Sequence, residues 1–576
     1  MFPSDEQRAV LDSPHRITVV HAVPGSGKTA VFVELFLSKA ITLAGTKKKI
    51  AALSFTTSAS KEIEERSKGA SNVHFVGTID SFLLKYLLKP FGTLFGLPKS
   101  GVSIIPSPLD EEMRARTVRI GRTAQDDTSI FKIKFSGGTI ENPTFTYTKN
   151  HVKTQVPAAY VAAVLRAKEA EWQARGRFTH SDCQYFTAKM LSDNRISPII
   201  LNILAARFPW VLVDEFQDTG HFLYLSLKQI LSHPQIKGLV VGDPDQLIFQ
   251  FSGADPNNFS DLLSLSGAQR LPVTTSRRCP QNICDLAGVF TNPGTTIVSA
   301  DPQAIGNIQV ITYSRDPNLT EQFVNDLIAR VGDLGKTIVV TRRNSDVSRL
   351  QGEVASQDYE IKSLAPKSIH RGIYLFKSGK TNEAFKVLTR TISNLIWEEE
   401  LLSPSDKKDL DWVDWKKKIF TLMIKLEKIV PLESWNQWVA RAKAATGEIA
   451  QSYGIVKNFS SLFKNDNNGG AQSRALTENI IPILPTVLND FHFKNVHKAK
   501  GTEAPTVIWY IPKQSANHCI FRACFDTNPD LEEMRVAFVA ITRSKKNLVI
   551  LMHQSSYTRL QTYRPNLFAS AQVINL

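Results

Sequence analysis

Residues 22–29 read AVPGSGKT and directly follow the apolar run ITVVHA at 17–22. The next stretch, TAVFVELFLSKAI at 29–41, has the apolar periodicity of a helix. A glycine-rich loop between a buried strand and a helix cradles phosphate, because its backbone amides and the positive end of the helix face the anion. The stretch therefore predicts an α/β fold built around a nucleotide-binding P-loop.

The chemistry of this loop depends on four residues. Gly25 and Gly27 allow the backbone to approach phosphate oxygens, and Lys28 is long enough to reach the β- and γ-phosphates. Thr29 is expected to hold Mg²⁺ through its hydroxyl. The loop departs from the general pattern at Ala22, where a glycine is usual. The predicted nucleotide contacts are Ala22, Val23, Pro24, Gly25, Ser26, Gly27, Lys28 and Thr29.

A pair of acids follows another buried strand. The segment VLVDEFQDT at 211–219 carries Asp214 and Glu215 to the carboxyl end of that strand, where ligands of α/β folds bind. We expect Asp214 in the shell of the magnesium ion and Glu215 as the base that polarises the attacking water. A solvated acidic turn is the alternative, but the P-loop in the same chain favours hydrolysis of a nucleoside triphosphate.

The chain of 576 residues is too long for one core and should form several domains. Apolar runs predict parallel strands at 17–22, 50–55, 73–78, 210–215, 238–243, 308–313, 337–342, 506–511 and 547–552. Helices are expected at 158–177, 320–332 and 412–430, and a polar loop at 464–474. We predict two α/β domains, each interrupted by a mainly helical insertion. The expected boundaries are 1–90 with 191–270 for the first domain, 91–190 for its insertion, 271–365 with 486–576 for the second domain, and 366–485 for its insertion.

The formal net charge of +15 suits a polyanionic partner, of which nucleic acid is the commonest, although a merely basic protein is the alternative. Five cysteines are too few for a disulfide framework, and Cys519 and Cys524 do not complete a zinc site with His518. We expect reduced thiols, no signal peptide and no membrane span of ~20 apolar residues. A cytoplasmic location follows, at the nucleoid if the protein is bacterial.

An ordered set of motifs identifies a family. Besides the P-loop and the acid pair, the chain carries SDEQRAV at 4–10, LSFTTSASKEIEER at 53–66, VGTIDSFLLKYL at 76–87, GDPDQLIFQFSGA at 242–254, SRRCPQNI at 276–283, TRRNSD at 341–346, VHKAKGTEAPTVIW at 496–509 and EEMRVAFVAITRS at 532–544. Their order and spacing resemble superfamily 1 DNA helicases of the UvrD/PcrA/Rep type. This resemblance implies two RecA-like P-loop motor domains that bind ATP and Mg²⁺.

The resemblance also implies roles for residues outside the P-loop. Gln246 would sense the γ-phosphate, while Arg278 and Arg543 would stabilise its transition-state charge from the second motor domain. Where the family commonly has a tyrosine that stacks on adenine, this chain has Arg277, which leaves the base preference less defined. Further nucleotide contacts are implied at Gln7, which would read adenine, and at Glu503, which would hold the ribose.

The DNA track implied by the resemblance is aromatic, because a base face stacks on a ring whatever its sequence. Phe55, Phe249 and Phe251 occupy the stacking positions, with ordinary core packing as the alternative. Candidate contacts to the strand's backbone are Thr56, Arg342 and His497. The chain departs from the family at Asp80, where histidine is usual, and at Phe251-Ser252, where the family has Trp-Arg; losing that arginine should weaken one strand contact.

We therefore expect an ATP-dependent translocase and helicase on single-stranded or tailed duplex DNA. The resemblance implies 3′–5′ movement, in DNA repair, replication or anti-phage defence, with room for a partner nuclease or repair protein. The alternative is an ATP-switched nucleic-acid sensor or assembly subunit of a defence complex with a partner nuclease, without processive unwinding. An RNA substrate also stays open, because stacking and phosphate contacts do not reject a 2′-hydroxyl.

Overall fold

The computed structural model describes residues 3–575 except 68, 106–116, 123–125, 150–151, 251–252, 293, 315–335, 344–345, 348–349, 351–363, 378, 380, 398–408, 429–434, 461, 464–490 and 514–530. The chain divides into two compact units. The first comprises Met1–Ser314, Gly335–Arg342 and Lys494–Leu576, and the second comprises Arg315–Leu334 and Arg343–Phe493. The expected helix at 320–332, the expected loop at 464–474, and Cys519, Cys524 and His518 lie outside the described residues.

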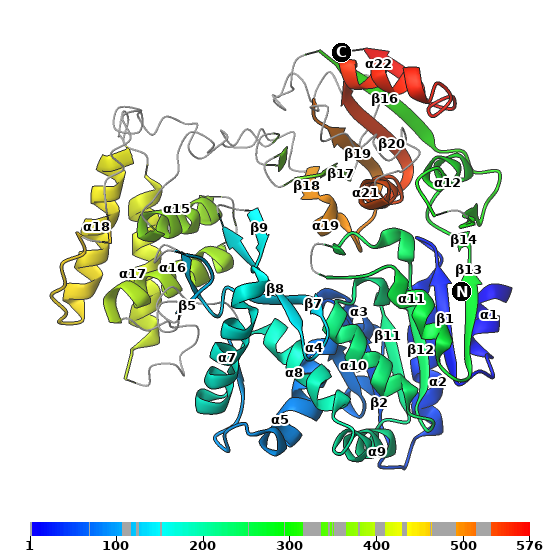
Figure 1. The fold of residues 1–576 in the computed structure, drawn as a ribbon. Helices are drawn as coiled ribbons and strands as arrows, with labels where there is room; N and C mark the ends of the chain where they lie inside the picture. The colour runs from blue at the N-terminus through cyan, green and yellow to red at the C-terminus, as the bar shows by residue number, and fades with distance from the viewer. Residues whose placement is uncertain are drawn as a thin grey trace. The chain divides into compact units, whose positions relative to one another are not determined.

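A six-stranded parallel sheet with strand order β13-β1-β12-β11-β2-β3 forms the centre of the N-terminal half of the first unit (Figure 1). Its strands are β1 (Ile17–Ala22), β2 (Ile50–Ser54), β3 (Phe75–Thr78), β11 (Trp210–Asp214), β12 (Lys237–Gly242) and β13 (Ala268–Val273). Side chains from both faces of the central strands are buried, as the continuous apolar runs predicted.

Helices cover both faces of this sheet. Val31 and Phe32 of α2 pack with Ile63 of α3 on one face, and Phe82 of α4 and Leu227 of α10 pack on the other. The helices around the sheet are α1 (Asp5–Leu11), α2 (Lys28–Thr42), α3 (Thr57–Arg66), α4 (Ile79–Leu83), α5 (Lys89–Phe91), α8 (His180–Ser192), α9 (Ser197–Arg207), α10 (His221–Ser232) and α11 (Asn257–Asp261). Because every strand is parallel, the loops after β1, β2, β11 and β12 meet at one edge, which is where the motifs lie.

The first insertion contains more strand than its sequence suggested. Its elements are β4 (Ser103–Ile104), β5 (Thr117–Arg119), β6 (Asp127–Ser129), β7 (Lys134–Gly138), β8 (Pro143–Lys149), β9 (Val152–Gln155), α7 (Ala158–Arg175) and β10 (Arg177–Phe178). Strands β7, β8 and β9 form an antiparallel sheet in which Phe135 pairs with Phe145. A turn at Gly138, with φ of 86°, reverses the chain between them. The two phenylalanines join the core that α8 completes, so this segment mixes strands and helices.

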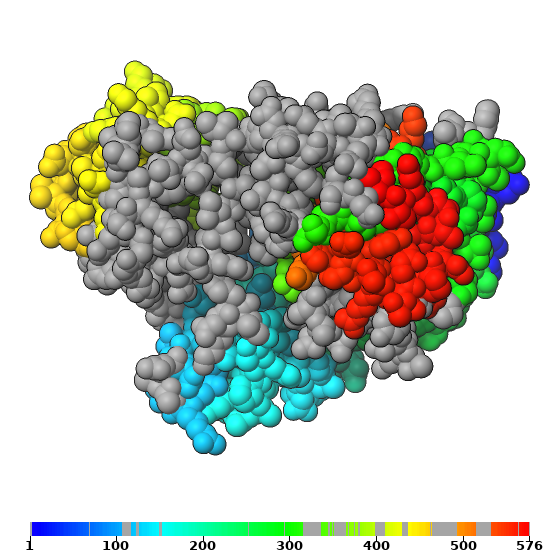
Figure 2. All heavy atoms as spheres, turned by 90° about the horizontal axis from the view of Figure 1, so that it is seen from above, coloured from blue at the N-terminus to red at the C-terminus, as the bar shows by residue number. Residues whose placement is uncertain are grey.

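A second six-stranded sheet has the order β18-β17-β19-β20-β16-β21. The elements of this half are β14 (Thr275–Ser276), α12 (Gln281–Gly288), β15 (Val298–Ser299), β16 (Asn307–Tyr313), β17 (Thr337–Thr341), β18 (Phe491–Asn495), α19 (Val496–Ala499), β19 (Ala504–Ile511), α21 (Leu531–Ile541), β20 (Ser544–His553), α22 (Gln554–Tyr563) and β21 (Gln572–Asn575). Figure 2 shows C-terminal residues in red beside residues drawn in green. Strand β16 pairs with β20 and β21.

The described helices of the second unit are α15 (Leu364–Lys377), α16 (Thr381–Trp397), α17 (Trp412–Glu427) and α18 (Trp435–Ser452). Their apolar stripes form one core around Trp415, Ile392 and Trp438. Every apolar run predicted as a strand is a strand, and the prediction of two parallel-sheet α/β domains of RecA-like type is confirmed. None of the described helices combines the length and apolar content needed to cross a bilayer.

Candidate nucleotide and DNA site

The P-loop lies in close contact with residues from distant parts of the chain. Gly25 and Gly27 have φ of 76° and 81°, in the left-handed region that favours glycine. A Cβ on Gly25 would lie 2.5 Å from Cβ of Arg278, and one on Gly27 would lie 2.7 Å from Nε2 of Gln7. Both glycines are therefore required by backbone conformation and by close approach, and the arginine motif lies directly against the loop.

Lys28 opens α2 at the end of this loop. Its ammonium donates a hydrogen bond to the carbonyl of Ala22 at 3.2 Å, and Thr29 follows it, half-buried, in the first turn. The loop is closed on itself by Ser26, whose hydroxyl donates to the carbonyl of Val23 at 2.7 Å. The bond to Ala22 therefore holds the ammonium of Lys28 at the start of the loop, where its charge acts on Asp214 and Glu215.

The predicted acid pair ends β11. Glu215 is the one described residue other than glycine with a positive φ, 53°, a conformation that costs an ordinary residue about 1 kcal/mol. Its amide donates to Oδ1 of Asp214 at 2.9 Å, and the side-chain amide of Gln217 donates to Oε2 of Glu215 at 2.5 Å. The two hydrogen bonds engage one oxygen of each carboxyl group next to this strained residue.

The two acids have opposite pKa shifts. Burial, with repulsion from Glu215, raises the pKa of Asp214 to about 7. Burial would also raise the pKa of Glu215, but the charges of Lys28 and Lys500 outweigh it and hold that pKa below its usual value. Glu215 is therefore ionised at neutral pH, as a group that polarises water must be.

Gln246 and Arg543 contact each other across the two halves of the first unit. Arg543 follows α21, is almost fully buried, and donates from Nη2 to Oε1 of Gln246 at 3.1 Å. Its Nε donates to the carbonyl of Val539 at 3.0 Å, which fixes the guanidinium plane. Burial, followed by the charge of Arg278, lowers the pKa of Arg543 to about 9, so it stays cationic at neutral pH.

Arg278 is held by the residue that was expected to bind ribose. Its Nε donates to Glu503 at 2.6 Å and its Nη1 donates to the carbonyl of Thr542 at 3.1 Å. Glu503 also pairs with Lys545. Both carboxylate oxygens of Glu503 are therefore engaged by cations, Oε2 by Arg278 and Oε1 by Lys545.

Gln7 and Arg277 form the other side of the nucleotide region. Nε2 of Gln7 donates to the carbonyl of Ser26 at 2.7 Å, and Nη2 of Arg277 donates to Oε1 of Gln7 at 3.1 Å. The backbone amide of Arg277 donates to the carbonyl of Gly25 at 2.9 Å. The two predicted base contacts therefore lie together against the P-loop.

Lys500 and Asp218 were missed by the sequence interpretation. Lys500 donates from Nζ to Asp218 at 2.5 Å and to the carbonyl of Gln246 at 3.0 Å, and it lies 3.7 Å from Glu215. Its motif, VHKAKG, was recognised, but His497 and Glu503 were chosen from it. Two signals in the sequence could have indicated these residues. Lys500 lies inside a recognised motif, and Asp218 follows Glu215 by three residues.

Two of the three predicted stacking residues, Phe55 and Phe249, lie in a row of rings with His497. The rings of Phe55 and Phe249 have centroids 5.9 Å apart, and those of Phe249 and His497 are 5.4 Å apart. Phe55 and Phe249 are only partly buried, so core packing does not account for them fully. The ammonium of Lys500 lies 5.5 Å from the centroid of the Phe249 ring, which links this row to the acids.

The remaining predicted strand contacts have partners of their own. Arg342 pairs with Glu533 at 2.9 Å and Glu532 at 3.3 Å, and its Nη1 lies 3.3 Å from Nε2 of His497. Burial, followed by the charge of Arg342, lowers the pKa of His497 to about 4, so the ring is neutral. Thr56 is exposed and caps α3 by accepting from the amide of Ala59. Phe251 lies outside the described residues.

Asp80, at the position where histidine is usual, accepts a hydrogen bond from the side-chain amide of Gln184 at 2.9 Å. Because Gln184 belongs to α8, this contact ties the motif to the neighbouring helix rather than to a strand-binding surface. Three buried cysteines form no disulfide: Cys183, Cys279 and Cys284.

The residues at the P-loop fit ATP and Mg²⁺. Gly25 and Gly27 have the left-handed conformation expected of a phosphate-binding loop, and Lys28 supplies a cation at its end. The carboxylate of Asp214 and the hydroxyl of Thr29 are oxygen donors, the type that Mg²⁺ prefers. These observations favour a triphosphate with its metal over a ligand without phosphate.

Comparisons with known proteins agree with this geometry. Residues 4–265 match the UvrD/REP helicase N-terminal domain, and residues 486–555 match the UvrD-like helicase C-terminal domain. A probable DNA helicase II homolog of Mycoplasma pneumoniae is 23% identical over 95% of this chain and 83% of its own length. The ATP-dependent DNA helicase PcrA of Leuconostoc citreum is 22% identical over 98% and 84%.

A further relative matches a smaller share of this chain. The Gabija protein GajB of Bacillus cereus is 27% identical over 49% of this chain and 47% of its own length. The two domain matches together cover more than half of the chain and include five strands of the first sheet and strands β18, β19 and β20 of the second. With its motifs in order along both sheets, the chain belongs to the UvrD/REP family of superfamily 1 ATP-dependent DNA helicases.

Proposed function

We propose that this protein is an ATP- and Mg²⁺-dependent translocase on single-stranded DNA that moves 3′ to 5′ and separates the duplex ahead of it. The observation that carries the proposal is the contact between Gln246 and Arg543. This contact joins the loop after β12, which carries Gln246, to the end of α21, which carries Arg543. A movement of Gln246 at the γ-phosphate would therefore be transmitted to both halves of the first unit. We also propose that the two motor domains and their insertions have the boundaries predicted from the sequence.

The chain's own residues have distinct tasks in this mechanism. Lys28 and the P-loop amides bind the phosphates, while Thr29 and Asp214 would hold Mg²⁺, which neutralises charge on the β- and γ-phosphate oxygens. Glu215 accepts the proton of the attacking water and Gln246 orients that water. Arg278 and Arg543 stabilise the charge that develops on the transferred group. The base and ribose contacts are Gln7, Arg277 and Glu503.

Lys500 supports coupling between hydrolysis and the DNA track. It contacts Asp218 and the backbone of Gln246 on one side and the ring of Phe249 on the other. Phe55, Phe249 and Phe251 would stack on bases, and Thr56, Arg342 and His497 would contact the strand's backbone. A shift of Lys500 on hydrolysis would move the row of rings relative to the strand.

The proposal is tested by ATPase rates and strand displacement on four substrates: single-stranded DNA, duplex with a 3′ tail, duplex with a 5′ tail, and single-stranded RNA. We expect stimulation of many-fold by single-stranded DNA and unwinding only of the 3′-tailed duplex. Unwinding of the 5′-tailed duplex alone would reverse the polarity. No stimulation by any polynucleotide would contradict the motor mechanism.

A second candidate is an ATP-switched subunit that works with a partner nuclease and does not unwind processively. Two observations favour it: the similarity to the Gabija protein GajB, and the ion pairs that hold Arg342 on Glu532 and Glu533. Displacement of streptavidin from biotinylated single strands separates the two candidates. DNA-stimulated ATPase without displacement favours the switch, and displacement favours the translocase.

A further inference from the structure

His21 lies at the carboxyl end of β1, directly before the P-loop, and is 8% exposed. It follows Ile17 and Val19 on the strand face that packs into the core. Phe259 of α11 contacts its ring edge-on, with centroids 6.4 Å apart. A polar ring at the end of an apolar strand face needs partners, and three charged side chains surround it.

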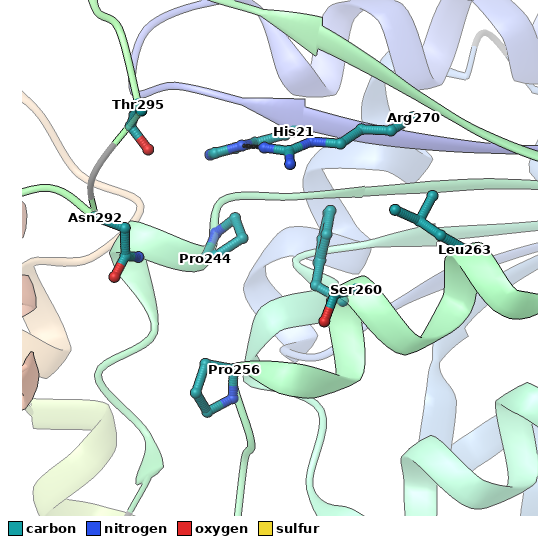
Figure 3. Close-up of a pocket in the computed structure, with 10 residues that line it drawn as sticks. His21, Pro244, Pro256, Ser260, Leu263, Arg270, Asn292 and Thr295 are labelled. Carbon is teal, nitrogen blue, oxygen red and sulfur yellow. Dashed lines mark hydrogen bonds between the residues drawn. The ribbon is translucent and has the colours of Figure 1, made fainter.

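The first partner fixes the tautomer of the ring. Nη2 of Arg270, on the neighbouring strand β13, lies 2.5 Å from Nδ1 of His21. A guanidinium can only donate, so Nδ1 accepts and the proton of the neutral ring is on Nε2. In Figure 3 the side chains of His21 and Arg270 point toward one another across the pocket.

The protonated Nε2 faces two carboxylates. It lies 3.6 Å from Oδ1 of Asp243 and 3.8 Å from Oδ2 of Asp245. These three side chains have the composition of a metal site. However, the donation from Arg270 leaves no lone pair on Nε2 for a metal ion, and Asp245 already accepts from Asn292 and Thr295. Nε2 is buried and makes no hydrogen bond to either carboxylate in this structure, and a small approach would let it donate to Asp243.

Asp243 in turn orients the side-chain amide of Gln246. Its Oδ2 accepts from Nε2 of Gln246 at 2.6 Å, and Oε1 of Gln246 accepts from Arg543 at 3.1 Å. An amide has its donor and acceptor on opposite sides, so binding its nitrogen to Asp243 turns its oxygen toward Arg543. Burial would raise the pKa of Asp243, but the contact with His21 and the charge of Lys28 lower it.

We propose that His21 is a positioning residue for ATP hydrolysis: its ring holds Asp243, which aims the amide of Gln246 at Arg543. The proposal rests on the proposed role of Gln246 at the γ-phosphate. The polar side chains that His21 meets are Arg270, Asp243 and Asp245, so we expect it to act on the sensor rather than on nucleotide binding.

The pocket beside His21 makes the residue suitable for substitution. Its volume is about 370 Å³, so a side chain of different shape does not have to displace the core. His21, Phe259 and Arg270 are among the residues that line it. His21→Leu removes both polar atoms at similar size. His21→Gln keeps an acceptor for Arg270 and a donor for Asp243.

The experiment measures kcat and KM for ATP with saturating single-stranded DNA, together with thermal stability. We expect His21→Leu to lower kcat about tenfold, a typical effect of losing a group that orients a site residue, with KM unchanged. We expect His21→Gln to restore most of kcat. The matched control is Thr18→Val on the same strand, whose hydroxyl bonds Ser13 at the far end and whose kcat should stay at the wild-type value.

A double-mutant cycle with Gln246→Ala separates the inference from the proposed function. If His21 acts through Gln246, the double variant is no slower than Gln246→Ala alone. A wild-type kcat in His21→Leu, multiplied losses in the double variant, or a His21→Gln variant as slow as His21→Leu each overturn the inference. A wild-type kcat in Gln246→Ala overturns the proposed role of Gln246 instead.

A second substitution covers the case in which His21→Leu does not fold. Arg270→Met, at an exposed position, removes the donor that fixes the tautomer. We expect it to lower kcat several-fold without changing KM for ATP. If Arg270→Met keeps the wild-type kcat and His21→Leu is unfolded, the inference is overturned.

Discussion

Lys500 donates a hydrogen bond to Asp218 at 2.5 Å, although 282 residues separate them along the chain. The side chains of both are almost fully buried, at 8% and 3% exposure. The pair connects the acid motif after β11 with the motif that begins in α19. This contact brings Lys500, which lies between β18 and β19 of the second sheet, close to Glu215 at the end of the first sheet.

We expect Lys500→Met to abolish most DNA stimulation of the ATPase while ATP binding persists. Removing one partner of a buried ion pair costs about 3 kcal/mol, so the free energy of unfolding should fall by a similar amount. Burial already raises the pKa of Asp218 to about 7 against the charge of Lys500, and the variant should raise it further. Denaturant unfolding and ATPase assays with and without single-stranded DNA measure both effects.

The matched control is Lys498→Met, an exposed lysine of the short helix α19 that Lys500 caps. Because Asp218 and Lys500 are in contact, the loss in stability from Asp218→Asn combined with Lys500→Met should be smaller than the sum of the single losses. Additive losses would show that the two residues do not act as a pair.

Lys28→Ala should reduce ATP turnover by at least 100-fold and leave binding of single-stranded DNA largely intact. The reason is that Lys28 supplies the cation at the phosphate cradle, while the row of rings lies elsewhere. Lys39→Ala, in the last turn of the same helix, is the control. A Lys28→Ala variant with wild-type ATPase would refute the assignment of the nucleotide site.

Phe249→Ala should weaken binding of single-stranded DNA about tenfold for every base composition, because stacking contributes about 1–3 kcal/mol per base whatever its identity. ATPase in the absence of DNA should stay within twofold of wild type. Fluorescence anisotropy with poly-dT and mixed-sequence oligonucleotides measures the affinity. Phe420→Ala, at a partly exposed ring of α17, provides the comparison, and equal affinities of the two variants would exclude a stacking role for Phe249.

The helical unit should lose stability in acid. Burial, followed by the charge of Lys377, lowers the pKa of His370 from 6.5 to about 4, and its ring packs edge-on against Trp438. Because the unfolded chain takes up the proton first, the stabilisation from neutral His370 is complete above pH 6.5 and is lost as pH falls through about 4. The shift corresponds to roughly 3 kcal/mol at most.

Thermal melts from pH 7.5 to pH 4 measure this effect in wild type and in His370→Phe. The variant has no ionisable ring, so its midpoint should fall less steeply with pH than that of wild type. Parallel slopes in the two proteins would mean that another group controls the acid sensitivity.

The central strands of both sheets could be predicted because each is a continuous apolar run, such as Ile17–Ala22 and Ala504–Ile511, buried on both faces. Edge strands were missed where the pattern is weak: β13 contains exposed Gln269 and Arg270, and β21 is short. The strands of the first insertion were missed for a similar reason. Their Phe135–Phe145 pairing depends on a partner strand, and apolar periodicity within one segment does not report it.

The sequence by itself determined the P-loop, the acid pair and the order of the motifs, because each is a local pattern of residues next to one strand or helix. Only the tertiary structure decided which of these residues meet: Arg543 on Gln246, Lys500 on Asp218, Glu503 on Arg278 and His21 beside Asp243. Such contacts join positions more than 200 residues apart. They depend on how neighbouring strands of one sheet, and the two sheets themselves, bring their ends together, which no local pattern of residues encodes.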